Sequence, residues 1–385
     1  MSELPQAEEE AKPDKTKRIF KWRRDNSAGN DLETTASGEV ENSTCRPIES
    51  AIRKLRSVFI APGRPANKEI MALCSAKHLI LSSVVFRAML QDEFKEGLEL
   101  NSTGKVTIPL PEDDAQALLL ILRIIHGPAS KVPDAIDLPT LALVATLTDK
   151  YQVHHWVDYF AQLWIERLRD ELPTTIRPLD HSGEMKCMIW LTIAWVFKRK
   201  RKFKAITRVL EREGMQSRLS THILIDGKGT YMPIPSPIID AIDKRRIDTL
   251  TELLAIIPEY VERLSTGGEA GASLCTKSGC DAEHPSRFVG LVSTAAAKSQ
   301  CEGMLLGTLI RAATAVDLWP VPDPHQVWIS CTTLKEHIEA FRIYSFCGMT
   351  HKDEPDSSHG LRSMIADSVE AVIARLDGVE LETFL

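Results

Sequence analysis

Apolar residues recur at helical spacing along most of this chain, and no other feature of the sequence limits the possible folds as strongly. The clearest case lies between Asp113-Asp114 and Gly127. Four apolar residues stand there at positions i, i+3, i+4 and i+7: Leu118, Ile121, Leu122 and Ile125. This spacing puts the four side chains on one face of a helix, so we expect them in the core. Either aspartate can cap that helix.

Further helices are predicted by the same periodicity and by capping residues. Ser82 or Ser83 can cap a helix that carries Phe86, and Pro139 can open another helix, where proline is tolerated. Residues 185–197 are apolar nearly all round, as in a buried helix. An apolar stripe marks the helix before them: Trp156, Phe160, Leu163, Trp164 and Leu168. Helical stripes continue toward the C-terminus, whereas residues 215–231 are predicted to form a loop.

Stretches with the character of strands are short. Residues 57–63 and 69–75 are predicted strands joined by a turn containing Pro and Gly, and residues 105–111 form a predicted strand closed by prolines. The sequence therefore predicts an α+β fold that is mostly α.

Composition excludes several classes of protein. A chain of 385 residues with 43% hydrophobic and 26% charged residues is typical of a soluble protein with two or three domains. The net charge of −6 gives no general attraction to nucleic acid or to acidic membranes. Residues 188–197 form the longest apolar run and cover about half the length of a membrane span. Eight cysteines in a chain of this length do not indicate a disulfide framework, so we expect the cytoplasm or nucleus.

The composition also predicts four segments. Residues 1–50 are polar and charged, which predicts a disordered tail; the basic island at residues 15–24 is a nuclear-import signal or, as we favour, part of a solvated tail. Residues 51–172 combine the predicted strands with helices. Residues 173–225 form a predicted helical extension, and residues 226–385 a predicted helical C-terminal region.

Several stretches in the second segment resemble a BTB/POZ domain. In chain order they are "AKHLILSSVVFRAML", "FKEG", "IPLPEDD", "LRIIHG" and "DKYQVHHWVDYF". These stretches are most similar to BTB proteins of filamentous fungi that carry a long helical C-terminal region. The resemblance implies a helix cluster with small flanking sheets that serves as a protein-interaction module. It is commonly a homodimer, and in many members it is an adaptor for a cullin-based ubiquitin ligase.

One departure from the family pattern concerns the dimer. Many members carry an Asp-Val pair on the first strand, with the Asp at the dimer interface. The expected first strand here, residues 57–63, contains no acidic residue.

The resemblance also implies roles for single residues. His78 stands where the family has a histidine that ends the second strand and anchors the first helices by hydrogen bonds. A catalytic base would need a partnered nucleophile and an orienting group, and the nearby sequence offers neither. Phe86 is expected as a structural core residue. Phe94 and Glu96 match the hydrophobic-x-acid pattern that docks on a cullin, although a plain helix end with solvated charges gives the same pattern.

Cysteine and histidine residues gather in the last third of the chain: Cys275, Cys280, Cys301, Cys347 and His359. The first two are close to the spacing of zinc ligands. A second closely spaced pair is missing from the sequence, which favours ordinary buried cysteines over a zinc site. We therefore expect no organic cofactor, with zinc as the alternative.

Two functions follow as expectations. The sequence contains none of the common catalytic motifs, such as GxSxG, a P-loop or HExxH, so we expect no enzyme, no small-molecule substrate and no membrane partner. The first expectation is a self-associating adaptor that recruits partners, including a cullin scaffold. The second is a nuclear regulator of transcription whose BTB domain oligomerises. The basic run at residues 198–202 lacks interleaved aromatic residues, so a solvated turn is favoured over nucleic-acid binding.

Overall fold

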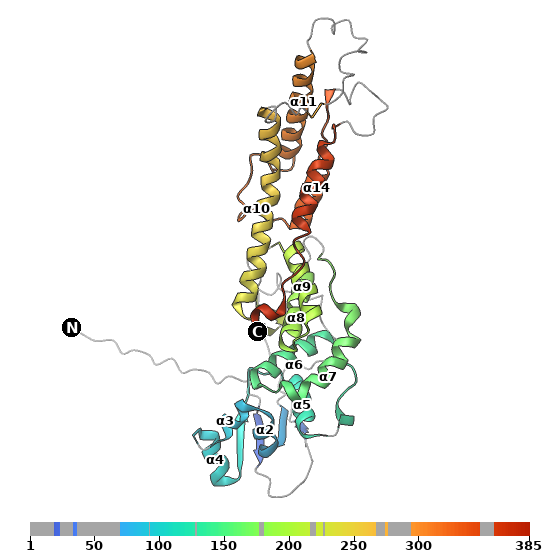
Figure 1. Ribbon diagram of the computed structural model, residues 1–385. Coiled ribbons are helices and arrows are strands. Elements are labelled where there is room, and N and C mark those ends of the chain that lie inside the picture. The colour runs from blue at the N-terminus through green and yellow to red at the C-terminus, as the bar shows by residue number, and fades with distance from the viewer. Residues whose placement is uncertain are drawn as a thin grey trace, which may run out of the picture. The chain divides into compact units, whose positions relative to one another are not determined.

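Helices dominate the computed structural model of this chain (Figure 1). The structure describes residues 19–23, 34–36, 70–91, 93–127, 129–176, 181–215, 221–225, 228–266, 274–275, 294–346 and 358–385. The chain forms two compact units, each made of several segments. The first consists of Met1–Leu172, Thr192–Lys198 and Thr221–Pro233, and the second of Pro173–Leu191, Arg199–Ser220 and Ile234–Leu385. The expected mostly helical α+β composition is confirmed.

A four-stranded sheet belongs to the first unit. Its strands lie in the order β2 (Thr34–Ala36), β3 (Ile70–Ser75), β1 (Ile19–Arg23) and β4 (Lys105–Pro109). Strand β1 pairs in parallel with β3 and antiparallel with β4. The predicted strands at residues 69–75 and 105–111 are confirmed within a residue or two.

The prediction of disorder throughout residues 1–50 is wrong for β1 and β2. The sequence "IFKWR" of β1 alternates apolar and basic residues in part, and it gains backbone hydrogen bonds from a neighbour on each side. Such long-range pairing overrides a polar local composition. The strand expected at residues 57–63 lies outside the described residues.

The helices of the first unit are short and lie close together in sequence. They are α2 (Ala76–Ser82), α3 (Val84–Leu90), α4 (Lys95–Thr103), α5 (Ala115–His126), α6 (Leu138–Tyr151), α7 (His154–Arg167) and the 3-10 turns η1 (Ala129–Lys131) and η2 (Arg169–Glu171). Asp114 caps α5, because its carboxylate accepts the amides of Gln116 and Ala117 at 3.1 and 3.0 Å. The predicted core face of α5 is confirmed, since Leu118 and Leu122 are fully buried and Ile125 is 4% exposed.

Helix α7 buries only part of the predicted stripe. Its buried side chains are Val157, Ala161, Trp164 and Ile165. Trp156 and Leu163, which belong to the predicted stripe, are 37% and 41% exposed. Trp164 of the predicted stripe is fully buried, but Val157, Ala161 and Ile165 complete the buried face, so the true face is only partly the predicted one.

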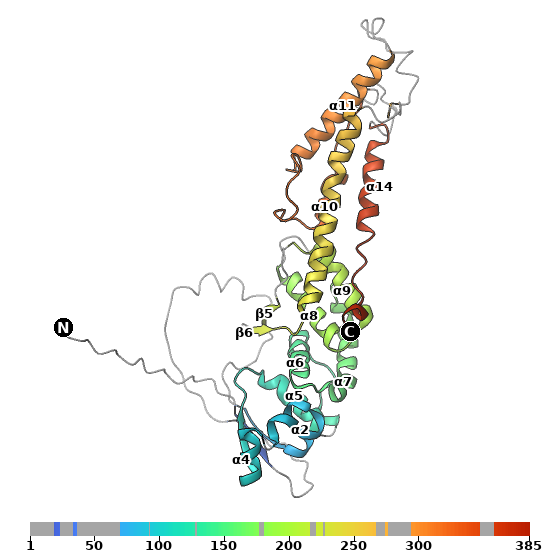
Figure 2. The same cartoon turned by 60° about the vertical axis from the view of Figure 1, so that its left-hand side comes forward.

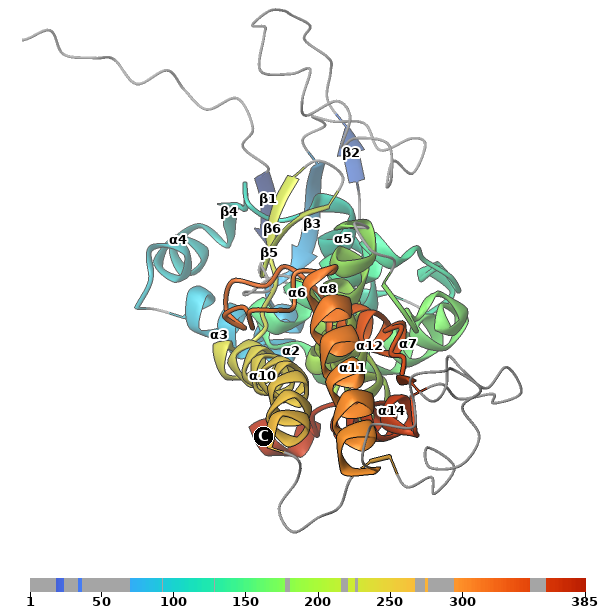
Figure 3. The same cartoon turned by 90° about the horizontal axis from the view of Figure 1, so that it is seen from above.

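The second unit is built on a long helix. Helix α10 (Ser236–Thr266) has 31 residues and lies beside α11 (Thr294–Thr314) and α14 (Leu361–Ile373), as Figures 1 and 3 both show. Helix α9 (Lys200–Glu213), helix α12 (Cys331–Glu339) and the turn η5 (Leu381–Phe384) complete it. Helix α8 (His181–Val196) begins in this unit, and its residues from Thr192 onward belong to the first unit.

A β-hairpin replaces part of the loop predicted for residues 215–231. Strands β5 (His222–Ile225) and β6 (Lys228–Tyr231) pair antiparallel (Figure 2). The sequence signal is Asp226-Gly227 between two strand-like stretches, which is a common hairpin pattern. The predicted helical segments 173–225 and 226–385 therefore also contribute a small sheet.

Candidate metal centre and candidate docking loop

The predicted docking loop connects α3 to α4. Phe94 is the N-cap residue of α4 and has an extended backbone, and its side chain is 51% exposed. Glu96 lies in the first turn of α4, where the helix dipole favours a negative charge. Leu98, one helical turn beyond Phe94, is 58% exposed. An aromatic residue, an aliphatic residue and a carboxylate are thus presented together at the start of one helix.

Gly97 fixes the path of this loop. The residue is buried, and a Cβ atom added to it would lie 1.7 Å from the backbone oxygen of Gln91. Only glycine allows such a close approach, so the backbone before α4 can fold against the end of α3. The exposed side chains of α4 are therefore held on a closely packed turn.

A histidine does tie the end of β3 to a helix, but it is His126 rather than His78. The Nε2 atom of His126 accepts a hydrogen bond from the amide of Ser75 at 3.0 Å. The ring proton therefore belongs on Nδ1, which donates to the carbonyl oxygen of Leu122 at 3.0 Å. His78 is exposed within α2, and its ring lies 5.2 Å from that of His126. A position in the first turn of a helix, with the side chain turned outward, explains why His78 does not make these bonds.

Phe86 lies in the buried contact between helices α3 and α6. Its ring is fully buried and stacks on Tyr151 at a centroid distance of 4.5 Å. Ser83 donates a hydrogen bond to the carbonyl oxygen of Tyr151 at 2.5 Å. The Tyr151 hydroxyl donates to buried Asp113, which also pairs with Lys150 at 2.5 Å. Burial and the Asp113 charge raise the pKa of Tyr151, so the hydroxyl keeps its proton and remains a donor.

Three of the five predicted metal ligands come together in the second unit. The Sγ atoms of Cys275 and Cys301 and a ring nitrogen of His359 all lie within 4.8 Å of one another. The distance between Cys301 Sγ and His359 Nε2 is 3.2 Å. Both cysteine side chains are fully buried. Cys280 and Cys347 lie outside the described residues.

This arrangement can hold a metal ion. Two thiolates and an imidazole are the donor atoms that zinc prefers. Tetrahedral coordination at ordinary bond lengths puts two sulfur ligands about 3.8 Å apart and sulfur and nitrogen about 3.5 Å apart. The distance of 3.2 Å between Cys301 Sγ and His359 Nε2 is a few tenths of an ångström shorter than the second value, and the limit of 4.8 Å between the other atoms allows the first. The three atoms fill three tetrahedral positions, and a water molecule or another side chain can supply the fourth.

A thiol beside an imidazole is also the pattern of a cysteine nucleophile. A nucleophile has to be reached by its substrate, however, and Cys301 has no exposed surface. A second buried thiol within 4.8 Å adds nothing to a nucleophile and completes a set of metal ligands. The geometry therefore favours a metal centre over a catalytic pair.

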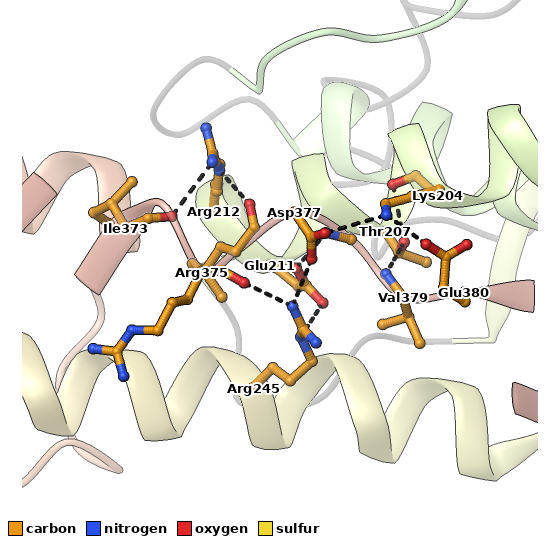
Figure 4. A network of polar contacts seen from close by, with 12 residues as sticks. Lys204, Thr207, Glu211, Arg212, Arg245, Ile373, Arg375, Asp377, Val379 and Glu380 are labelled. Carbon is orange, nitrogen blue, oxygen red and sulfur yellow. Dashed lines mark hydrogen bonds and ion pairs between the residues drawn. The ribbon is translucent and has the colours of Figure 1, made fainter. Parts of the chain in front are cut away.

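A network of polar contacts lies elsewhere in the second unit (Figure 4). At its centre, Glu211 of α9 is fully buried and forms an ion pair with Arg245 of α10 at 2.8 Å. The two charged groups are close, but they are not aligned as a hydrogen bond. Glu211 also accepts the amide of Gly378 at 3.1 Å. Burial raises the pKa of Glu211 to about 7, against the opposing effect of Arg245.

The network holds the segment that follows α14. Arg212 donates to the carbonyl oxygens of Ile373 and Leu376, and Thr207 accepts the amide of Val379 at 2.8 Å. Lys204 pairs with Asp377 at 3.1 Å and also with Glu380. Figure 4 shows these side chains reaching from α9 and α10 toward one stretch of backbone. The arrangement fixes the C-terminal segment and offers no group placed for chemistry.

Sequence patterns gave only a partial view of these sites. Glu211 and Thr207 fall on the apolar stripe that Phe203, Ile206 and Leu210 mark on α9. A charged residue on a buried stripe is the signal that could have found the network. The sequence does not show its partners, because Arg245 belongs to another helix and Gly378 lies 167 positions away. No local pattern indicated His126.

The chain matches no family model, no curated protein and no solved structure. The resemblance to a BTB/POZ domain therefore stays a prediction. Among the described residues, no helix is both long enough and apolar enough to cross a membrane.

Proposed function

We propose that this chain is a protein-interaction module of BTB type and an adaptor that docks on a cullin scaffold. Its work is done by surfaces rather than by chemistry. The observation that carries the proposal is the exposed Phe94 at the start of α4, two residues before Glu96. The elements from β3 to α7 support it, because short helices and two strands of one sheet make up this stretch, and the resemblance implies a helix cluster with small flanking sheets.

The exposure of Phe94 fits an anchor for a partner. An aromatic ring that is half exposed in the free chain gains its remaining burial on binding, and such rings are enriched among interface hot spots. Leu98 lies one turn away on the same face of α4 and enlarges the apolar surface. Glu96 adds a charge beside this surface, which favours a basic rim on the partner. Because Gly97 fixes the backbone, little ordering is needed when the partner binds.

The test is a binding measurement with the full chain and a purified cullin N-terminal region. We expect Phe94→Ala to weaken binding by about 30-fold or more, the equivalent of about 2 kcal/mol. Tyr159→Ala is the matched control, because Tyr159 is an exposed aromatic residue of the same unit on α7. Glu96→Lys should weaken binding through its charge.

Stability has to be measured on the same variants. Phe94 is exposed, so its truncation should leave the melting temperature nearly unchanged. A folded Phe94→Ala chain that binds as tightly as wild type would contradict the proposed docking site. Wild-type chain that binds no cullin at all would contradict the choice of partner.

Self-association is a second part of the proposal. Leu81 of α2 and Val84 of α3 are 68% and 57% exposed, and an exposed pair of aliphatic residues suits a contact with a second copy. Light scattering of the full chain should show a dimer at tens of micromolar. A strictly monomeric chain under these conditions would contradict the proposed self-association, but it would not bear on the proposed docking loop.

A further inference from the structure

We infer that Cys275, Cys301 and His359 bind one zinc ion, which fastens three separate segments of the second unit together. The site is independent of the proposed docking function, since its ligands lie in the other unit. The metal would be structural, because the two thiols are buried and a closed site needs no access for substrate.

The first observation is where the three ligands come from. Cys301 lies within α11, Cys275 belongs to a segment between α10 and α11, and His359 belongs to the turn that precedes α14. Cys301 and His359 are 58 residues apart in the chain. The two cysteines form a small buried cluster separate from the large apolar core of this unit. Leu305 and Leu361 belong to that core and Leu274 packs against it, so a bound ion would fasten the three segments beside the core.

The second observation is that hydrogen bonds from the backbone position Cys275 and the turn that carries His359. The amide of Leu274 donates to the Glu302 carboxylate at 3.1 Å, which places Cys275 beside the residue that follows Cys301. Ser358 accepts the amides of Leu361 and Arg362 at 3.0 and 3.2 Å and so fixes the turn on which His359 lies.

The backbone of this turn is also unusual. His359 has a φ of 53° and Gly360 a φ of 78°, so two consecutive residues lie in the left-handed region. Histidine is among the residues that tolerate this region, although few residues other than glycine adopt it. The reversal at these two residues places the imidazole against Cys301. A residue held in a rare conformation at a cluster of ligands is typical of a functional constraint.

The third observation is the chemistry of the donor atoms. Sulfur and imidazole nitrogen suit zinc, whereas magnesium and calcium prefer oxygen. On binding, each thiol gives its proton to solvent, and the resulting thiolate forms a coordinate bond to the metal. Two thiolates neutralise the charge of Zn²⁺, so the buried complex carries no net charge from these groups.

The first test is the metal content of the full chain after exchange into a buffer with a weak chelator. We expect about one zinc per chain for the wild type, as for a structural site. Cys275→Ser, Cys301→Ser and His359→Ala should each lose most of that zinc. Cys331→Ser and His325→Ala are the matched controls, because Cys331 is a buried thiol of the same unit and His325 is exposed. Both should keep the metal.

A second measurement does not depend on whether the variants fold. X-ray absorption of the wild-type chain should show two sulfur ligands at about 2.3 Å and at least one nitrogen ligand at about 2.0 Å. Removal of zinc with a strong chelator should increase hydrogen exchange at residues 358–361 and 298–302, and added zinc should restore protection.

Three results would overturn the inference. The wild-type chain could neither contain zinc nor take it up from micromolar solution. The ligand variants could retain as much zinc as the two controls. The two cysteines could form a disulfide even in the presence of zinc, which would leave no thiolate to bind it.

Discussion

The two units hold their helices together in different ways. In the first unit, α5 buries an almost continuous row of leucine and isoleucine against α2, α6, α7 and β3. In the second unit, an apolar core is supplemented by a charged network that holds the C-terminal segment around buried Glu211. Apolar burial depends little on pH, whereas a buried carboxylate with a raised pKa makes stability depend on it. The units should therefore respond differently to mutation, pH and salt.

The largest effect is expected in the apolar interior of the first unit. Leu122 is fully buried on α5, so Leu122→Ala removes buried methyl groups and leaves a cavity. We expect a loss of about 2–5 kcal/mol in the free energy of unfolding. Urea unfolding, followed by hydrogen exchange in peptides of the first unit, would measure it.

Leu98→Ala provides the matched control, because Leu98 is 58% exposed on α4 and lies outside the proposed contact with a second copy. This substitution should lower the free energy of unfolding by no more than about 0.5 kcal/mol. If the two substitutions lower the free energy of unfolding by the same amount, α5 does not form the core of the first unit, and the proposed difference between the units is wrong.

Much of this interior could be predicted from the sequence, because helical periodicity is a local signal. The spacing of Leu118, Ile121, Leu122 and Ile125 fixed the buried face of α5, and the aspartate pair located its start. The same signal misled on α7, where Val157 and Ala161 are buried while Trp156 is exposed. Trp164 of the same stripe is fully buried, so periodicity located the helix but did not define which side of it faces the neighbouring helices.

Features that depend on distant partners could not be predicted in the same way. Strand β1 becomes a strand because β3 and β4 lie on either side of it, and its own composition suggests a solvated tail. The metal ligands were identified by residue type, but only folding brings Cys275, Cys301 and His359 within 4.8 Å. Phe94 and Glu96 were identified by a short pattern, whereas the exposure of Phe94 required the structure.

An intermediate effect is expected at the centre of the charged network. Burial raises the pKa of Glu211 from 4.5 to about 7, so between these pH values the folded chain keeps a proton that the unfolded chain has released. Unfolding then releases a proton, and stability falls as pH rises through this window before it levels off above about pH 7. The shift corresponds to a change on the order of 3 kcal/mol.

Glu211→Gln should remove most of this pH dependence. The amide stays neutral at every pH and can still accept the Gly378 amide. The groups that face position 211 are Arg245 of α10, Arg212 of α9 and Asp377 of the C-terminal segment. Urea unfolding of the full chain at pH 5 and pH 8, resolved by hydrogen exchange over residues 199–213, would measure the change.

Glu262→Gln is the control, because Glu262 is an exposed residue on α10. It should leave the difference between pH 5 and pH 8 unchanged. Glu213, whose pKa burial also raises, should leave a residual slope in the Glu211→Gln chain. Equal pH dependence in wild type and Glu211→Gln would show that Glu211 does not set it.

The smallest effect is expected at the edge of the same network. Arg375 pairs with Glu252 of α10, and the two side chains are 60% and 46% exposed. Exposed ion pairs contribute about 0–1 kcal/mol, because water screens them and both long side chains lose freedom. Arg375→Ala should therefore cost less than about 1 kcal/mol. The backbone carbonyl of Arg375, which accepts from Arg245 at 2.9 Å, is retained in this variant.

Salt should affect the exposed Arg375–Glu252 pair and the buried Glu211 differently. Raising the ionic strength shortens the distance over which exposed charges act, whereas a buried group is screened much less. The small cost of Arg375→Ala, measured by urea unfolding, should vanish in high salt, while the pH dependence set by Glu211 should persist. A cost of several kcal/mol that survives high salt would show that the exposed pair and buried Glu211 act as one cooperative network. The charged contacts would then stabilise the second unit as strongly as the apolar row on α5 stabilises the first.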